Sequence, residues 1–237
     1  MTTLAGIAAA HDLPPASVSA LEAYLALLAA DPQAPTSVTA RAGALDAHVA
    51  DSLVALEIPA VRDARVLADL GSGAGPPGIV LAAALPGARM VLVEATRRKA
   101  DFLIRAAAAA GLSNVEVVAL RAEEWDEGAG ACDIVTARAL APLPVLAEYA
   151  APLLREGGEL VAWKGRRDLA EQAAGAAAAA EVGLEAVEIR PVTPFPAARD
   201  RHLHRYLKRC ATPARFPRRP GMATKRPLGA HSRAKST

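Results

Sequence analysis

The chain has 237 residues, 52% hydrophobic and 22% charged, which favours one α/β domain with short extensions and excludes a wholly disordered chain. No stretch of about 18 apolar residues is free of charge, so we expect no membrane span. The first residues lack the basic start of a signal peptide. Only two cysteines occur, Cys132 and Cys210, which excludes a disulfide framework and predicts a cytoplasmic protein.

Charge is distributed unevenly along the chain. From Arg201 onward there are eleven Lys and Arg residues and no Asp or Glu. Residues 1–200 hold 16 Lys and Arg against all 25 Asp and Glu, a net charge of −9. A basic end on an acidic body is typical of proteins that bind a polyanion such as nucleic acid. The alternative is a solvated tail without a partner.

Two helices are expected in residues 1–60, which we interpret as an N-terminal helical cap. Residues 17–30 form the first, with Ser17 as a candidate N-cap and Leu21 and Leu25 at helical spacing. Residues 43–56 form the second, because Leu45, Val49, Leu53 and Leu56 share one stripe of that helix.

From residue 64 short apolar runs alternate with helix-like segments. The expected strands are 65–70, 89–93, 115–119, 133–137, 159–163, 185–189 and 203–208. The expected helices are 77–85, 96–110, 142–154 and 168–182. This order predicts a Rossmann-like α/β fold over 61–210, a mostly parallel twisted sheet with helices on both faces and an antiparallel last strand. Residues 211–237 are expected to be a basic, flexible tail.

A glycine-rich loop, Asp69-Leu-Gly-Ser-Gly-Ala-Gly-Pro-Pro-Gly78, follows the first strand of this domain. Gly71, Gly73 and Gly75 allow positive φ and close approach of a ligand to the backbone. Pro76 stands where the dinucleotide fingerprint needs its third glycine, so a dehydrogenase is the least favoured function. The loop resembles the first motif of S-adenosylmethionine (AdoMet) methyltransferases, in which Asp69 would receive the methionine ammonium. The alternative is a purely structural turn.

Carboxylates follow the next two strands. Glu94 lies 21 residues after Gly73, where an acceptor can hold both ribose hydroxyls. Arg121-Ala-Glu-Glu-Trp125 follows the third strand, at the turn that faces adenine in the methyltransferase fold. The backbone of Ala122 and the side chain of Glu123 are therefore candidates to hold the adenine amino group. The alternatives are a strand-end charge and a surface acidic turn.

The fourth strand ends in Thr136-Ala-Arg138-Ala-Leu, at the position that usually faces the transferred methyl group. Arg138 stays protonated and cannot act as a general base, so the target atom should already be nucleophilic, as guanine N7 is. We therefore expect Arg138 to position the substrate. A structural ion pair of Arg138 is the alternative. Cys132, at the wrong end of this strand, is expected to be a packed small residue.

The remaining lysine and histidine candidates give weaker indications of function. Lys164, at the end of the fifth strand, could neutralise a phosphate. His48 and Asp51 share one face of the second helix, where a capping or core role is favoured. His202 and His204 alternate in the last strand, and because metal-ligand spacing is absent elsewhere we predict no metal.

These segments together resemble the small-subunit ribosomal RNA guanine-N7 methyltransferase family, also called glucose-inhibited division protein B. The matching pieces are HVADSL (48–53), DLGSGAGPPGIVLA (69–82), RAEEW (121–125), TARAL (136–140), WKG (163–165), RHLHRYLK (201–208) and TPARFPRRPGMATKRPL (212–228). The resemblance implies methyl transfer from AdoMet to N7 of the guanine at position 527 of 16S rRNA. It also implies a cytoplasmic bacterial protein whose partner is this rRNA or the small (30S) subunit. We expect a monomer.

The resemblance also assigns roles to residues. It carries AdoMet contacts onto Gly71, Pro76, Ala122, Glu123 and Arg138, and it makes candidate RNA contacts of three cations: Arg121, Lys164 and Arg201. The family usually has Leu at position 76, so Pro76 keeps a backbone contact there without an amide donor. It often has Asp where this chain has Glu94, a longer acceptor.

Two other functions are compatible with these residues. One is an AdoMet-dependent methyltransferase that acts on a small molecule or a protein, with an incidental basic end. The other is a non-enzymatic RNA- or nucleotide-binding module, which would not bind AdoMet.

Overall fold

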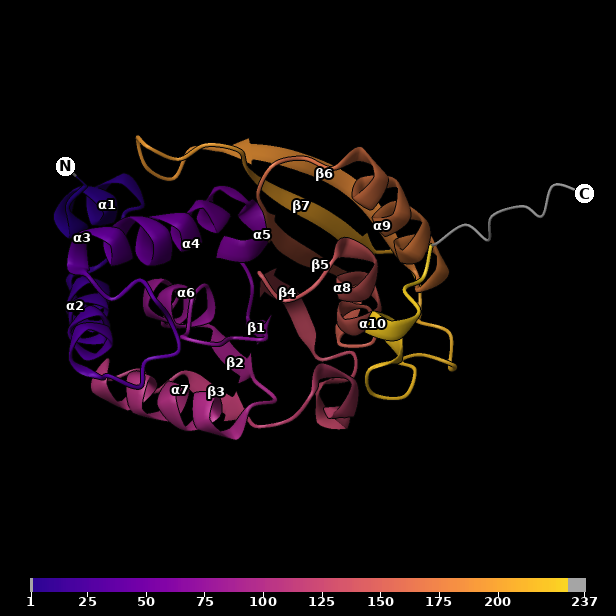
Figure 1. Ribbon diagram of the computed structural model, residues 1–237, viewed down its shortest axis with the longest axis horizontal. Helices are drawn as coiled ribbons and strands as arrows, with labels where there is room; N and C mark the ends of the chain where they lie inside the picture. Colours follow the sequence, from indigo (N-terminus) through magenta and orange to yellow (C-terminus); the bar gives the residue numbers. More distant parts are fainter. Residues whose placement is uncertain (1, 230–237) are drawn as a thin grey trace, which may run out of the picture.

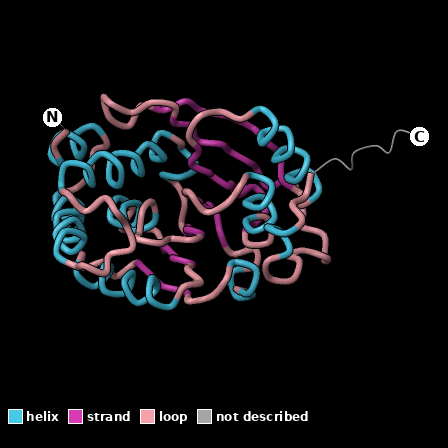
Figure 2. Tube along the Cα trace, viewed as in Figure 1, coloured by secondary structure: helices cyan, strands magenta, loops and turns pink. Residues whose placement is uncertain are grey.

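A computed structural model describes residues 2–229, and its centre is a sheet of seven strands in the order β3-β2-β1-β4-β5-β7-β6 (Figures 1 and 2). The bounds are β1 Val66–Leu70, β2 Arg89–Val93, β3 Val115–Val118, β4 Cys132–Arg138, β5 Leu154–Lys164, β6 Leu184–Val192 and β7 Arg201–Lys208. β7 is antiparallel to both of its neighbours, and the other paired strands are parallel. The expected strand set and the antiparallel last strand are confirmed.

Helices cover both faces of the sheet, as predicted. The longer ones are α1 Leu4–Ala10, α2 Pro15–Ala30, α6 Gly78–Ala84, α7 Arg97–Ala109, α8 Leu143–Ala150 and α9 Leu169–Glu181. Side chains alternate along β1, so Leu67 packs with the N-terminal helices, α6 and α7, whereas Ala68 packs with α8 and α9. The helical cap and the sheet therefore share one core (Figure 1). Within residues 2–229 no helix has the length and apolar character needed to cross a bilayer.

The start of the first cap helix differs from its prediction. α2 begins at Pro15 behind an N-cap at Pro14, so Ser17 lies within the first turn of the helix, where it is buried and its hydroxyl makes no hydrogen bond. The assignment of Ser17 as N-cap is wrong because proline is well tolerated in the first turn, where no amide partner is needed.

The second expected helix, 43–56, is helical but irregular. It is divided into α3 Arg41–Ala44, a π-helix η1 Leu45–Ala50, α4 Asp51–Leu53 and a 3-10 turn η2 Val54–Glu57, followed by α5 Pro59–Arg62. Apolar spacing does not distinguish an α-turn from a π-turn. π-segments are often found at functional sites, and this one ends directly before Asp51.

The boundary between α8 and β5 also differs from the prediction. The helix ends at Ala150, and β5 begins at Leu154, before the glycines at 157 and 158. Gly158 is needed there because a Cβ would lie 2.8 Å from the carbonyl oxygen of Asp133. Cys132 is fully buried at the start of β4, as predicted.

The C-terminal segment is folded as far as residue 229. It contains the short helix α10 Met222–Lys225, which packs against α8 (Figure 1). Its Phe216 and Ala223 are buried in the same core cluster as the residues of α8. The expectation of a flexible tail over 211–237 is therefore wrong for residues 211–229, because apolar and ion-pair contacts hold them. Residues 230–237 lie outside the described residues.

Asp69 joins three parts of the fold at the end of β1. Its side chain is fully buried; one oxygen accepts a 2.8 Å hydrogen bond from Thr136 Oγ1 on β4, and the other lies 3.3 Å from the amide nitrogen of Gly78, the first residue of α6. A Cβ on Gly78 would lie 2.9 Å from this carboxylate, so glycine is required for the approach. Burial raises the pKa of Asp69 to about 7, against the opposing effect of these hydrogen bonds.

We predict that Asp69→Asn changes how stability depends on pH. A carboxyl whose pKa is raised from 3.8 to about 7 contributes stability that is fully present below pH 3.8 and is lost as pH rises through 7. Relative to the variant, wild-type protein should therefore lose up to about 1.4 kcal/mol of unfolding free energy per pH unit between these values. Urea unfolding at pH 5, 6, 7 and 8 measures this difference. Parallel stability curves for the two proteins would contradict it.

Candidate cofactor and substrate site

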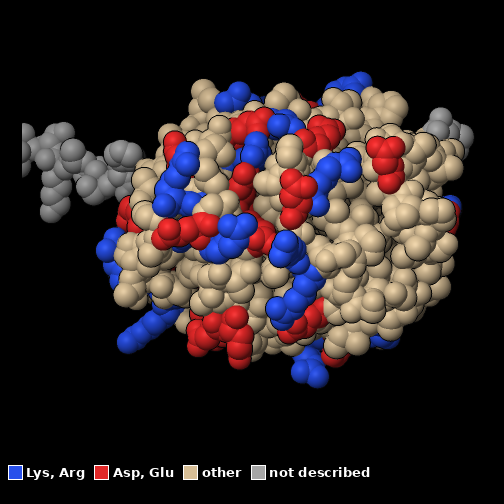
Figure 3. Space-filling model, turned by 180° about the vertical axis from the view of Figure 1, so that it is seen from behind, with Lys and Arg blue, Asp and Glu red and all other residues tan. Residues whose placement is uncertain are grey.

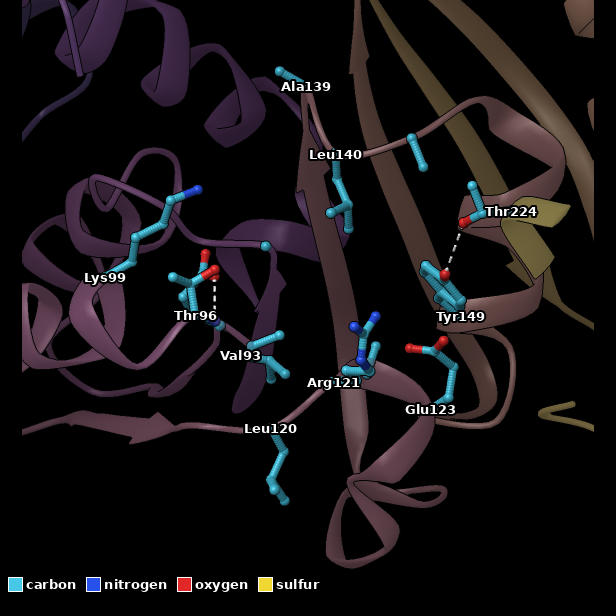
Figure 4. A pocket seen from close by; sticks show the side chains of 15 residues that line it. Val93, Thr96, Lys99, Leu120, Arg121, Glu123, Ala139, Leu140, Tyr149 and Thr224 are labelled. Atoms are coloured by element: carbon cyan, nitrogen blue, oxygen red, sulfur yellow. Dashed lines mark hydrogen bonds between the residues drawn. The ribbon is translucent and has the colours of Figure 1, made fainter. Parts of the chain in front are cut away.

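A cavity of about 470 Å³ lies at the carboxyl ends of the first four strands, where a ligand is expected in an open α/β sheet (Figure 4). Each of these strands contributes the residues that follow it, and α8 and α10 close one side. The lining residues are Gly71, Val93, Glu94, Ala95, Thr96, Lys99, Leu120, Arg121, Ala122, Glu123, Ala139, Leu140, Ala141, Tyr149 and Thr224. We call this the nucleoside cavity.

The glycine loop contributes Gly71 to the wall of the nucleoside cavity. Gly71 has φ +66°, and a Cβ there would lie 2.6 Å from the Leu140 side chain, so both conformation and space require glycine. Gly73, Gly75 and Pro76 do not line the cavity. They shape the loop behind it.

Glu94 is held in one orientation by the backbone. Its Oε2 accepts a 3.0 Å hydrogen bond from the amide of Gly73, and its Oε1 accepts a 2.8 Å bond from the amide of Thr96. The carboxylate is 6% exposed, and it borders the cavity. Because each carboxylate oxygen can accept more than one hydrogen bond, Glu94 retains capacity for hydroxyl donors of a ligand.

The turn after β3 brings Arg121, Ala122 and Glu123 to the same cavity, as their positions in the sequence predicted. Figure 4 shows Arg121 and Glu123 on the side of Tyr149 and Thr224, across the cavity from Lys99 and Thr96. Glu123 has a second partner, because its Oε1 accepts a 3.0 Å hydrogen bond from the amide of Gly221 in the C-terminal segment.

Asp69 is not part of this wall. Its carboxylate is fully buried and engaged with Thr136 and Gly78, and none of its atoms lines the cavity. We therefore assign Asp69 to the architecture of the loop rather than to the ammonium contact that the sequence predicted.

A second cavity, of about 210 Å³, adjoins the first at Ala139. Ala139 has φ +55°, a left-handed conformation that L-residues rarely adopt and that tends to cluster at ligand sites. Four of its lining side chains carry or can carry positive charge. We call it the basic cavity; its lining is Asp51, Arg138, Ala139, Trp163, Lys164, Gly165, Arg201 and His202.

Arg138 lies in the basic cavity rather than in the nucleoside cavity. Its Nη1 donates to Asp51 Oδ2 at 2.8 Å and to the carbonyl of Ala47 at 2.6 Å. The structural ion pair that was the alternative for Arg138 is thus present. Trp163 also contacts α4, the helix that begins at Asp51, since its indole N–H donates to the carbonyl of Asp51 at 2.7 Å.

The remaining candidate cations differ in how far they are engaged. Lys164 forms a 2.6 Å ion pair with Glu171, whereas Arg201, about half exposed, approaches Asp51 only to 3.8 Å. His48 has the core role that was favoured for it, because its Nε2 lies 3.0 Å from the carbonyl oxygen of Val38. Burial is the largest cause that lowers the pKa of His48, and nearby Arg138 adds to it.

The nucleoside cavity has the chemistry that a nucleoside sulfonium compound requires. Two carboxylates, Glu94 and Glu123, border it and can accept from ribose hydroxyls and an amino group, and apolar Val93 and Leu140 lie beside them. The dinucleotide fingerprint is broken, because Pro76 stands where that fingerprint needs its third glycine. The residues present therefore fit AdoMet better than a dinucleotide. Among residues 2–229 no three His, Cys, Asp or Glu side chains are grouped as a metal site.

Sequence reasoning missed two kinds of site residue. Thr96 and Lys99 follow Glu94 by only a few positions and could have been found from the strand end before α7. Tyr149 and Thr224 could not, because they are 75 positions apart and meet only through the packing of α10 on α8.

Comparisons with known proteins agree with this geometry. Residues 17–203 match the model of the family GidB, described as rRNA small subunit methyltransferase G. A protein named ribosomal RNA small subunit methyltransferase G from Rubrobacter xylanophilus is 44% identical over 187 residues, covering 76% of this chain and 72% of that protein. A protein of the same name from Moorella thermoacetica is 36% identical over 224 residues, covering 91% and 92%.

Solved structures show the same fold at lower similarity. A 16S rRNA adenine methyltransferase from Catenulisporales acidiphilia has a TM-score of 0.53 at 20% identity, and covers 65% of this chain and 90% of its own. Fibrillarin from Aeropyrum pernix, solved with bound S-adenosyl-L-methionine, has a TM-score of 0.51 at 19% identity, with 67% and 73% covered. The family match, the curated relatives and the fold agree, and this chain belongs to the rRNA small subunit methyltransferase G family.

Proposed function

We propose that this protein transfers a methyl group from AdoMet to N7 of the guanine at position 527 of 16S rRNA. The observation that carries the proposal is the pair of adjoining cavities, one bordered by carboxylates at the ends of β2 and β3, the other lined by cations. Such a pair accommodates a nucleoside donor and a polyanionic acceptor side by side, with Ala139 between them.

The residues of the nucleoside cavity would hold the donor. Glu94, oriented by two backbone amides, is placed to accept from the ribose hydroxyls, and Ala122 and Glu123 are placed beside the adenine. Gly71 permits close backbone approach. Gly73, Gly75 and Pro76 support the loop from behind, and Asp69 fixes it to the sheet.

The chemistry needs no general base from the protein. AdoMet, when bound, supplies a methyl group on a positively charged sulfur. The lone pair of guanine N7 would accept this methyl group, and the electron pair of the bond between methyl and sulfur would stay with the sulfur. No proton has to leave N7, which agrees with a basic cavity whose Arg138 cannot accept one. The protein contributes orientation and exclusion of water.

The acceptor side is suited to RNA. Lys164, Arg201 and Arg121 surround the two cavities and can pair with phosphate oxygens or with the N7/O6 edge of guanine.

The face turned away from the viewer in Figure 1 has Lys and Arg interspersed with Asp and Glu, so it presents no uniformly positive field (Figure 3). We propose a monomer that acts on 16S rRNA or the 30S subunit in the cytoplasm.

The proposal is tested with 30S particles from cells that lack this protein. Incubation with the protein and AdoMet labelled in the methyl group should place label in 16S rRNA, and mass mapping should locate it as 7-methylguanine at position 527. Calorimetry with AdoMet alone provides the binding control. Label in a protein or a small molecule, with none in 16S rRNA, would instead support the second methyltransferase function. A failure to bind AdoMet would support the non-enzymatic module.

We predict that Arg138→Ala lowers methyl transfer by about 10²-fold, the order expected when a substrate is misplaced by about an ångström. AdoMet affinity should stay close to that of wild type, since Arg138 lies outside the nucleoside cavity. Arg190→Ala is the matched control, because Arg190 donates to the carboxylate of Glu188 on β6 and to the carbonyl of Glu57 in the N-terminal cap, away from both cavities. Unchanged turnover in Arg138→Ala would remove this residue from the substrate site.

We predict that four exposed cations of the C-terminal segment contribute to RNA affinity through phosphate contacts. These cations are Arg215, Arg219, Lys225 and Arg226. Replacement of all four by glutamine should reduce the slope of the logarithm of RNA affinity against the logarithm of salt concentration by up to about 3. Replacement of Arg65 and Arg89, two exposed cations at the amino ends of β1 and β2, serves as control. The salt dependence of 16S rRNA binding measures both, and an unaltered slope in the fourfold variant would show that the segment does not touch RNA.

A further inference from the structure

The C-terminal strap, defined here as residues 213–229, forms part of the nucleoside cavity. Thr224 lines the cavity and its hydroxyl lies 3.3 Å from that of Tyr149, which lines it as well (Figure 4). The amide of Gly221 donates to Glu123, the carboxylate placed beside the adenine. The strap is thus in contact with the cavity at two separate points.

A buried ion pair holds the strap against α8. Glu148 is 1% exposed, and Arg218 meets both of its oxygens, with Nε at 2.8 Å from one and Nη2 at 2.5 Å from the other. The backbone amide of Arg218 donates to Glu148 as well, at 3.2 Å. A bidentate pair with a planar guanidinium is the strongest and most directional ion pair available to a protein.

The same arginine also fixes the far side of the strap. Its Nη2 donates to the carbonyl of Arg226 at 2.9 Å, which ties the end of α10 to the start of the strap. Phe216 and Ala223 are buried on either side, and the amide of Gly229 lies 3.4 Å from Glu181. Arg218 therefore determines where the segment with Gly221 and Thr224 lies.

We propose that Arg218 and Glu148 are positioning residues for the cofactor: they hold the strap so that Gly221 and Thr224 complete the nucleoside cavity. The inference rests on the proposed binding of AdoMet. If only the closed strap forms a complete cavity, the apparent dissociation constant equals the intrinsic one divided by the fraction of closed molecules. Reciprocally, bound AdoMet favours the closed strap.

The first test measures AdoMet affinity by calorimetry. In Arg218→Met the dissociation constant for AdoMet should rise by about tenfold, corresponding to a strap that is closed in about a tenth of the molecules. Glu148→Gln, which keeps the shape of the side chain, should raise it in the same direction, and Arg218→Lys should give an intermediate value. In methylation assays KM for AdoMet should rise by a larger factor than kcat falls.

Arg205→Met is the matched control. Arg205 forms a bidentate pair with Glu159, also largely buried, but on β7 and β5 and outside the nucleoside cavity. Both substitutions are expected to lower the melting temperature, but only Arg218→Met should lower the affinity for AdoMet. Equal affinities in the Arg218 and Arg205 variants would reduce the Arg218 pair to a purely structural role and overturn the proposal.

The second test uses the unmodified protein. Trypsin can cut the strap after the exposed Lys225 and Arg215, whereas Pro220 and Pro227 protect the bonds after Arg219 and Arg226. AdoMet should slow cleavage after Lys225 severalfold in wild type and to a much smaller extent in Arg218→Met, if that variant folds. If AdoMet binds wild type by calorimetry yet leaves this cleavage unchanged, the strap is not coupled to the cofactor. If AdoMet binds no form of the protein, the proposed function itself fails.

Discussion

The buried carboxylate of Asp69 is the contact on which the arrangement of the site depends. It joins the end of β1 to β4 through Thr136 and to the start of α6 through Gly78, at the place where the strand order changes direction. The glycine loop between these points is anchored to the sheet at its start and at its end. Gly71 then faces the cavity and Gly73 can orient Glu94. Asp69, the acidic residue of the motif, thus acts on the site through the backbone that it positions.

The two cavities divide the chemistry between them. Carboxylates with fixed orientation border the nucleoside cavity, whereas cations line the basic cavity, and the strained Ala139 stands between the two. The Arg138–Asp51 pair connects β4 to the irregular helix of the N-terminal cap, so the cap contributes directly to the basic cavity. A methyl acceptor that needs no deprotonation is compatible with a cavity in which Arg138, at the end of β4, donates hydrogen bonds and cannot accept a proton.

The C-terminal segment has two faces with different roles. Its inner face buries Phe216 and Ala223 and meets the nucleoside cavity at Gly221 and Thr224, and its outer face exposes cations. The buried Glu148 makes this possible, because a carboxylate removed from water needs a close, well-oriented partner, and Arg218 supplies it. A segment whose composition is typical of disorder is thus ordered by the Arg218–Glu148 pair together with further hydrogen bonds and buried apolar side chains.

The sequence by itself determined the strand and helix order, the parallel sheet and the residues after each strand, since periodicity and turn chemistry are local. Gly71, Glu94, Ala122 and Glu123 could be brought to one cavity because parallel strands end at one edge. Only the tertiary structure decided that Asp69 is buried away from the cavity, that Arg138 pairs with Asp51, and that Tyr149 meets Thr224. Each of these depends on partners far apart in the chain, and the competition between a ligand and a protein partner for one side chain is settled by packing.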